Sequence, residues 1–157
     1  MCFIEGTSIL CFQPIPDYKE KYIPIEELRV GDLVKTLRHG YRRISMIWRG
    51  KMQNNTQNIW ESIYSCDKLL LTGGHGVFED DIHPRCVSKC EDKYIVPANQ
   101  SLRFFPIDGT RSFYTYHIAL ESDGDDFRRF GVWANGVLVE TSTIHHFIHN
   151  NYTSHTN

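Results

Sequence analysis

The amino-acid sequence predicts a single all-β domain, and three observations indicate it. Short apolar stretches recur along the 157 residues, with turn signals between them. Several of these stretches alternate apolar and polar residues with period two, which is typical of half-buried strands. No stretch of the sequence keeps a long helical period. A chain of this length, with 41% hydrophobic and 23% charged residues, is long enough for one domain with a real core.

The strands are expected wherever this alternation is clearest. They are predicted at residues 7–10, 22–25, 32–36, 43–48, 68–71, 93–96, 113–120 and 131–139. One helical turn is expected at residues 25–28, since Pro24 suits the start of a helix and Gly31 suits its end. Polar loops are predicted at residues 51–58 and 122–126. We assign residues 1–142 to the domain and residues 143–157 to a polar, histidine-rich C-terminal tail, expected to be loosely ordered.

Charge and hydropathy argue against two classes of partner. The net charge is −2, and basic residues cluster only at Arg38, Arg42 and Arg43, where a solvated loop is expected. We therefore expect no nucleic-acid partner. No apolar run approaches the ~20 residues that span a bilayer, and no signal peptide is recognisable. We expect a monomer that binds no membrane, with a cytoplasmic location by default.

Cys2 stands at the start of the predicted fold, where a thiol can attack the carbonyl carbon of the residue before it. On its own, a terminal cysteine is better explained as a small buried hydrophobic residue or an unreactive terminal thiol. At neutral pH only a few per cent of such a thiol is ionised unless a base or a positive charge assists it. A reactive role for Cys2 therefore requires other groups that the chain must supply.

Residues 69–78, with the sequence L-L-L-T-G-G-H-G-V-F, contain the best candidates for those groups. Gly73 and Gly74 allow the backbone to turn sharply and to approach another segment closely. Thr72 and His75 then converge on one side of the turn. The histidine can give a proton to a leaving amide nitrogen, and the threonine hydroxyl can orient the same bond. The alternative is an ordinary β-turn with a surface histidine.

Together, these stretches resemble the Hint family, the module shared by hedgehog autoprocessing domains and inteins. The resemblance begins with C-F-I-E-G-T-S-I at residues 2–9 and continues with L-T-G-G-H-G-V at residues 71–77. Y-I-P-I-E-E-L-R-V-G-D-L-V-K-T is similar to the family's segment after its first strand. Y-T-Y-H-I-A-L-E and F-G-V-W-A-N-G-V-L-V-E-T-S are similar to its closing strands. The resemblance extends from Cys2 to about Ser142.

The resemblance implies a compact, horseshoe-like Hint fold whose two chain ends meet at the active site. Cys2 matches the first nucleophile, which converts the preceding amide to a thioester. Thr72 and His75 match the residues that activate the scissile peptide. His117 falls where many inteins carry an aspartate and is expected either to shuttle protons or to be a strand histidine beside Tyr116.

The sequence departs from the intein pattern at its end. Inteins close with histidine and asparagine followed by a nucleophile, whereas Glu140, Thr141 and Ser142 occupy these positions. Threonine has no side-chain amide to cyclise, so splicing by asparagine cyclisation is not expected. The family's histidine before the A-N-G strand is also missing, with Phe130 and Gly131 in that region. The pair His149-Asn150 lies beyond the last matching strand and is interpreted as a coincidence.

The resemblance therefore implies a hedgehog-like use of the module. Its partners are an upstream polypeptide fused before Cys2 and a small external nucleophile: water, a thiol, an amine or a hydroxyl. The reaction is a single-turnover self-cleavage rather than multiple-turnover enzyme catalysis, and it needs no cofactor. The tail is too short and polar for sterol recognition, so cholesterol transfer is not expected.

Only Met1 precedes Cys2 in this sequence. Either the domain belongs to a longer protein, or it is a remnant that releases only methionine or never reacts. We prefer the first interpretation, because the strand pattern begins at Cys2. An inactive interaction domain on the same scaffold is the alternative function.

A structural zinc site is a further alternative. The chain has five cysteines, and an odd number argues against a disulfide framework. His83, Cys86 and Cys90 are three possible zinc ligands, with a fourth from Cys66 or His75. The spacing is loose and no second cysteine pair exists, so we assign no metal ligands.

Overall fold

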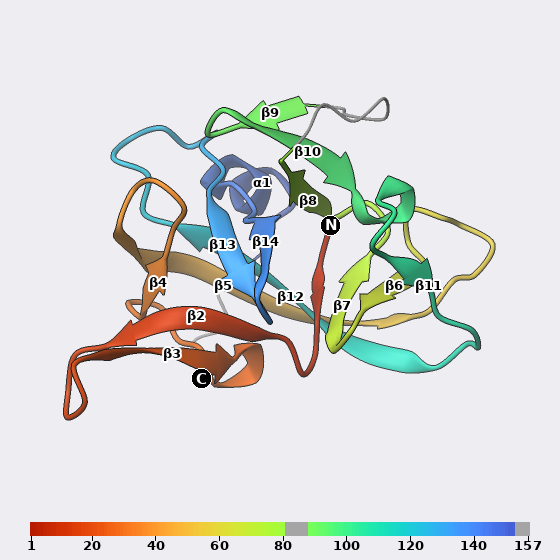
Figure 1. Ribbon diagram of the computed structural model, residues 1–157, viewed down its shortest axis with the longest axis horizontal. Helices are drawn as coiled ribbons and strands as arrows, with labels where there is room; N and C mark the ends of the chain where they lie inside the picture. Colours follow the sequence, from red (N-terminus) through yellow and green to blue (C-terminus); the bar gives the residue numbers. More distant parts are fainter. Residues whose placement is uncertain (81–87, 153–157) are drawn as a thin grey trace.

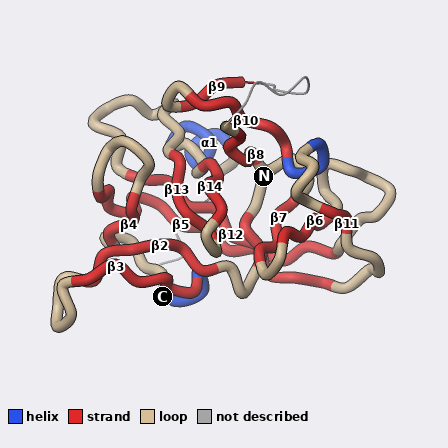
Figure 2. Tube along the Cα trace, viewed as in Figure 1, coloured by secondary structure: helices blue, strands red, loops and turns tan. Residues whose placement is uncertain are grey.

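The structure is a computed structural model that describes residues 1–80 and 88–152. Within these residues the strands join edge to edge into one antiparallel sheet (Figures 1 and 2), and the prediction of a single all-β domain is confirmed. The strands in its first half are β1 (Phe3–Ile4), β2 (Ser8–Gln13), β3 (Lys19–Pro24), β4 (Leu33–Lys35), β5 (Tyr41–Gln53), β6 (Ile63–Cys66) and β7 (Leu69–Thr72). Those in its second half are β8 (Gly76–Glu79), β9 (Ser88–Cys90), β10 (Lys93–Pro97), β11 (Phe105–Pro106), β12 (Ser112–Leu120), β13 (Gly131–Ala134) and β14 (Val137–Glu140).

Two long strands, β5 and β12, connect the two ends of the sheet. They pair along most of their length, with His117 opposite Trp48 and a register shift between Ala119 and Leu120. The first part of β5 also pairs with β4, while the other edge of β12 pairs with β1. The sheet runs in the order β11-β6-β7-β1-β12-β5-β4-β2-β13-β14-β8-β10-β9, and β3 pairs with β2. Segments far apart in the sequence therefore meet near the start of β1.

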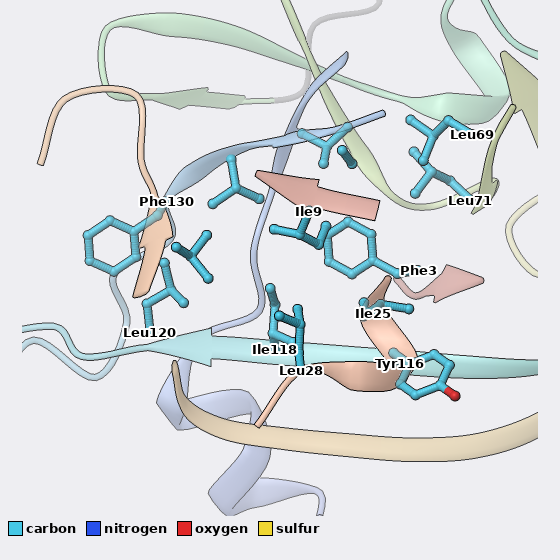
Figure 3. Packing of buried hydrophobic residues seen from close by; sticks show 14 of the residues in the cluster. Phe3, Ile9, Ile25, Leu28, Leu69, Leu71, Tyr116, Ile118, Leu120 and Phe130 are labelled. Carbon is cyan, nitrogen blue, oxygen red and sulfur yellow. The ribbon is translucent and has the colours of Figure 1, made fainter. Parts of the chain in front are cut away.

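The short strand β1 is buried on both faces. Phe3 faces the main core, which includes Ile9, Leu71 and Phe130 (Figure 3), and Ile4 faces a second cluster of buried apolar residues. Because successive side chains of a strand point to opposite faces, two residues suffice to anchor β1 on both sides. Phe3 pairs with Tyr116 of β12 and with Leu71 of β7. This pairing fixes Cys2, the residue before it, between these two strands.

The structure differs from the expected elements at several places. The single strand expected at residues 131–139 is a hairpin of β13 and β14, because Asn135 and Gly136 turn the chain with φ of 48° and 83°. The first residues of the expected loop 51–58 belong to β5. The strands β1, β6, β8, β9 and β11 were not expected. The predicted helical turn is confirmed as the 3-10 helix η1 (Ile25–Glu27), and a second one, η2 (Ala98–Gln100), follows β10.

The start of the C-terminal tail is ordered, so the expectation of a loose segment is wrong for residues 143–152. Helix α1 (Ile144–His149) packs against β12 and β5. Thr143 caps it by accepting a hydrogen bond from the His146 backbone N–H at 3.0 Å, and Phe147 is fully buried. The boundary between domain and tail at residue 142 stays a prediction. In the part of the chain that the structure describes, the helices do not have the length and apolar character needed to cross a membrane.

Candidate functional site

The backbone of Cys2 is held by Thr72, the last residue of β7. The Cys2 amide N–H donates a hydrogen bond to Thr72 Oγ1 at 2.8 Å. In return, the Thr72 N–H donates to the Cys2 carbonyl oxygen at 3.2 Å. The peptide nitrogen that joins Met1 to Cys2 is therefore fixed against the threonine hydroxyl. Figure 1 shows the N-terminus near β8, beside the turn that links β7 to β8.

The turn after Thr72 is tightly fixed to its neighbours. The Gly73 N–H donates to Ser62 O at 2.8 Å, and the His75 N–H donates to Thr72 O at 2.9 Å. A Cβ atom on Gly73 would lie 1.9 Å from the carbonyl oxygen of Ile59, so only glycine fits this position. The expected close approach of this turn to another segment is confirmed. The packing sets the direction of both Thr72 and His75.

His75 is 1% exposed, and its ring packs against the Phe3 ring in an edge-to-face arrangement, with 4.5 Å between the ring centroids. Its Nε2 lies 3.0 Å from the carbonyl oxygen of Glu140. A carbonyl oxygen only accepts hydrogen bonds, so Nε2 carries the proton in the neutral ring. Nδ1 is then an unprotonated acceptor, and it has no hydrogen-bond partner of good geometry in the described residues. His75 is thus a buried base bonded through Nε2, and its other polar contact, with the Cys2 backbone, is not well aligned.

Burial lowers the pKa of His75 to about 3, and the positive charge of the N-terminal ammonium group acts in the same direction. Hydrogen bonding to the backbone of Glu140 and of Cys2 opposes this shift. His75 is therefore neutral at neutral pH. Its low pKa reflects the energy needed to place a charge in this buried site beside an existing positive charge.

His117 of β12 approaches the sulfur of Cys2. Its Nε2 lies 3.3 Å from Cys2 Sγ, and its Nδ1 lies 3.2 Å from Ser142 Oγ. Burial lowers the pKa of His117 to about 3, assisted by the N-terminal ammonium group and by His146 and His75. In the neutral ring, a proton on Nδ1 donates to Ser142, and Nε2 accepts from the thiol. The ring faces Cys2 rather than Tyr116, the neighbour expected in the structural interpretation of this histidine.

The Cys2 thiol is protonated in this arrangement. Burial raises the pKa of Cys2, while the N-terminal ammonium group and a hydrogen bond with Thr115 act in the opposite direction. Since the pKa of His117 is lowered, the proton stays on sulfur and the pair is neutral. The site holds a thiol, two neutral imidazoles and a hydroxyl around one peptide bond. These groups are able to pass a proton from sulfur to nitrogen during an acyl shift.

The segment that follows β14 completes the site. The carbonyl oxygen of Glu140 bonds to His75, and its carboxylate pairs with Arg129 at 2.7 Å and accepts from the Gly76 N–H at 3.0 Å. Burial raises the pKa of Glu140, opposed by Arg129. Ser142 bonds to His117, as described above. Residues 140–142 therefore lie beside Cys2 at the end of β14.

Four residues near Cys2 were not singled out by the sequence analysis. Trp48, Tyr152 and His146 surround the His117 ring, with centroid distances of 5.3 Å for each. Ser142 was recognised only as a position in the family pattern and not as a partner of His117. These residues and His117 come from β5, from β12 and from the C-terminal segment. Because these parts are far apart in the sequence, no short motif contains them together.

Other candidate residues lie elsewhere. Asn150 at the end of α1 is exposed, and its side-chain amide donates to His146 O at 2.8 Å. Two of the possible zinc ligands, His83 and Cys86, lie outside the described residues. Cys90 bonds to Arg129 O at 3.4 Å, and residues 1–80 and 88–152 contain no cluster of three or more histidine, cysteine or acidic side chains suited to a metal ion.

Comparisons with known proteins find a distant structural likeness. No family model matches the sequence, and no curated protein matches it. Among solved structures, the chain is similar to a crystal structure of the gp41-1 intein, with 13% sequence identity and a TM-score of 0.40. The alignment covers 88% of this chain and 97% of the intein chain. At this identity and TM-score the chain is not assigned to the intein family.

Proposed function

We propose that this chain is a Hint-type self-processing domain in which Cys2 captures the acyl group that precedes it. The Cys2 sulfur attacks the carbonyl carbon of the residue before it, a C–S bond forms, and the C–N bond to Cys2 breaks. An upstream polypeptide is thereby held as a thioester. A small nucleophile, such as water, a thiol, an amine or a hydroxyl compound, then releases it.

One observation carries this proposal: the two atoms of Cys2 that must react are each engaged by a separate group. The amide nitrogen is 2.8 Å from Thr72 Oγ1, and the sulfur is 3.3 Å from His117 Nε2. Attack by sulfur and departure of nitrogen require help at both atoms at once. A buried terminal cysteine with a purely structural role requires neither contact.

Stabilisation of the transition state is needed, because the amide loses its resonance on going to the thioester. Twisting a peptide by ~12° costs only about 1 kcal/mol, so strain of that size contributes little. Hydrogen bonds aimed at the developing charges are each worth roughly 3–4 kcal/mol in known acyl-transfer enzymes. The hydrogen bond between Cys2 and Thr72 fixes the nitrogen where such help can act.

The proton count balances with water as the intermediary. In the neutral ring the proton of His75 is on Nε2, facing Glu140 O, so Nδ1 must first take a proton from water. The thiol proton leaves to His117 Nε2, His75 Nδ1 gives its proton to the departing nitrogen, and His117 then returns its proton to water, so that in net one proton moves from sulfur to nitrogen. Residues fused before Met1 would remove the ammonium charge that lowers the pKa of both histidines. We therefore expect both imidazoles to be more basic in a fusion than in the free chain.

The test is a reporter protein fused to Met1 and treated with dithiothreitol at neutral pH, with the products identified by mass. We expect release of the reporter after Met1, and loss of release in Cys2→Ala. We also expect release to slow strongly in Thr72→Ala and His75→Ala. Cys66→Ala removes another partly buried thiol and serves as the matched control. Equal release from Cys2→Ala and the parent fusion would contradict the proposal.

A non-catalytic interaction domain is the second candidate. The raised pKa of Cys2 and the lowered pKa of His117 favour it, because they keep the thiol protonated at rest. A folded fusion that stays intact with dithiothreitol and with hydroxylamine would support this candidate.

A further inference from the structure

The residues after Ser142 return the chain to the thiol of Cys2. Phe147 anchors α1 in the core, and Asn151, with φ of 51°, turns the backbone after the helix. The Tyr152 N–H then donates to Phe147 O at 3.1 Å. This turn directs the Tyr152 side chain back toward β12 and β5.

The Tyr152 ring covers the imidazole that contacts the thiol. It is stacked on His117, with 5.3 Å between the ring centroids and 21° between the ring planes. It also contacts Trp48 of β5, at 4.6 Å and 36°, and the rings of His146 and Phe147 at 5.5 Å and 5.9 Å. Burial raises the pKa of the Tyr152 phenol, and a thiolate at Cys2 would act in the same direction. The His117 ring contacts both the Tyr152 ring and the Cys2 sulfur, so Tyr152 adjoins the thiol through this imidazole.

An acyl group carried on Cys2 Sγ would lie beside the rings of Tyr152 and Trp48. The nucleophile that resolves it attacks the thioester carbonyl carbon, breaks the C–S bond and gives up a proton, which passes through His117 Nε2 to the sulfur. To do so it must reach the region between His117 and the acyl carbon. Tyr152 and Trp48 limit the space next to that ring.

We propose that Tyr152 determines which nucleophiles resolve the acyl group on Cys2, admitting small ones and excluding bulky ones. This inference rests on the proposed self-processing function. One large side chain can exclude bulky acceptors by steric hindrance, while the chemistry at the sulfur stays the same. Tyr152 is thus a specificity-determining residue rather than a proton donor in the reaction.

The test compares two acceptors on the full-length reporter fusion: hydroxylamine, which is small, and 4-mercaptophenylacetic acid, which is bulky. In Tyr152→Ala we expect the ratio of the bulky rate to the small rate to rise about tenfold, the size of a modest steric discrimination. Tyr152→Phe keeps the ring and is expected to keep the parent ratio. An unchanged ratio in Tyr152→Ala would overturn the inference while leaving the proposed function intact.

A second measurement does not depend on cleavage. The free chain is treated with iodoacetamide or with fluorescein maleimide, and modification of Cys2 is quantified by peptide mass. We expect Tyr152→Ala to increase labelling by the bulky reagent more than labelling by the small one. Equal increases would overturn the inference. A parent fusion that no acceptor releases would instead overturn the proposed function, and this inference with it.

Discussion

The two sides of Cys2 are built in different ways. Thr72 bonds to the amide from a contiguous turn that also carries His75, and hydrogen bonds from Gly73 and His75 hold this turn in place. The thiol is approached by His117 together with Ser142, Trp48 and Tyr152, which come from three segments far apart in the sequence. The amide side therefore depends on local backbone geometry, and the thiol side depends on the assembly of the whole fold. Substitutions on the amide side should therefore act by disturbing the local turn, whereas substitutions on the thiol side should act by disturbing the packing of the whole fold.

The largest effect is expected on the thiol side, from removing the anchor of α1. Phe147→Ala deletes a fully buried ring and should lower the free energy of unfolding by about 3–5 kcal/mol. Ile148→Ala, next to it but 56% exposed, should change it by less than ~0.5 kcal/mol. Urea unfolding measures both. Equal effects would mean that the C-terminal helix is not part of the cooperative fold.

The corresponding test of the amide side is Gly73→Ala. The new methyl group would clash with the Ile59 carbonyl oxygen, and we expect a loss of about 3 kcal/mol of stability. At Gly74 the nearest atoms are 3.5 Å from the added carbon, which is an ordinary contact, so Gly74→Ala is the matched control. Thermal unfolding of the two variants side by side should separate them. If Gly73→Ala is as stable as Gly74→Ala, the turn is not held as described.

Acid should destabilise both sides together. The folded-state pKa values of His75 and His117 are lowered to about 3, below the unfolded value of about 6.5. Between these pH values the unfolded chain binds more protons, so stability is full above about pH 6.5 and falls as the pH drops toward 3. Each histidine contributes a slope of up to about 1.4 kcal/mol per pH unit. Urea unfolding from pH 7 to pH 4 should show a shallower slope in His117→Gln, and an unchanged slope would contradict the assignment.

The smallest effect is expected from the hydrogen bond that orients His117. Ser142→Ala removes a bond worth about 1 kcal/mol, so thiol-induced release of a fused reporter should slow about fivefold. Ser122→Ala removes a buried hydroxyl that has no hydrogen-bond partner in the described residues, and it should leave the rate unchanged. Similar rates for both variants would show that Ser142 does not position the imidazole.

The same contrast explains what the sequence could predict. The turn at residues 72–75 was recognisable because its glycines and polar residues are adjacent in the chain. The long strand β12 was also recognisable, because residues 113–120 form a run of mostly apolar and aromatic residues. The two-residue strand β1 has no period to detect, since its neighbours β7 and β12 define it. The hairpin of β13 and β14 carried a visible signal, Asn135-Gly136, which is typical of tight turns.

The residues around the Cys2 thiol could not be predicted from local sequence patterns. Helix α1 has only six residues, so the helical spacing of Ile144, Phe147 and Ile148 is too short to predict it, and of these only Phe147 is fully buried. Tyr152 reaches His117 only because Asn151 adopts a left-handed conformation after the helix. Ser142 meets His117 through the packing of the end of β14 against β12. The structure brings Cys2 within hydrogen-bonding distance of Thr72 and His117, and the catalytic roles of these residues stay a proposal.

Chemical identification of the released fragment tests most directly whether Cys2 captures the acyl group before it. A reporter fused to Met1 is treated with hydroxylamine at pH 7, and the released reporter is weighed by intact-mass spectrometry. We expect a hydroxamate on the Met1 carbonyl and a remaining chain that begins with a free Cys2 amine and thiol. A fragment ending in a carboxylate while hydroxylamine is in excess, a cut at any other bond, or a folded fusion that stays whole would contradict it.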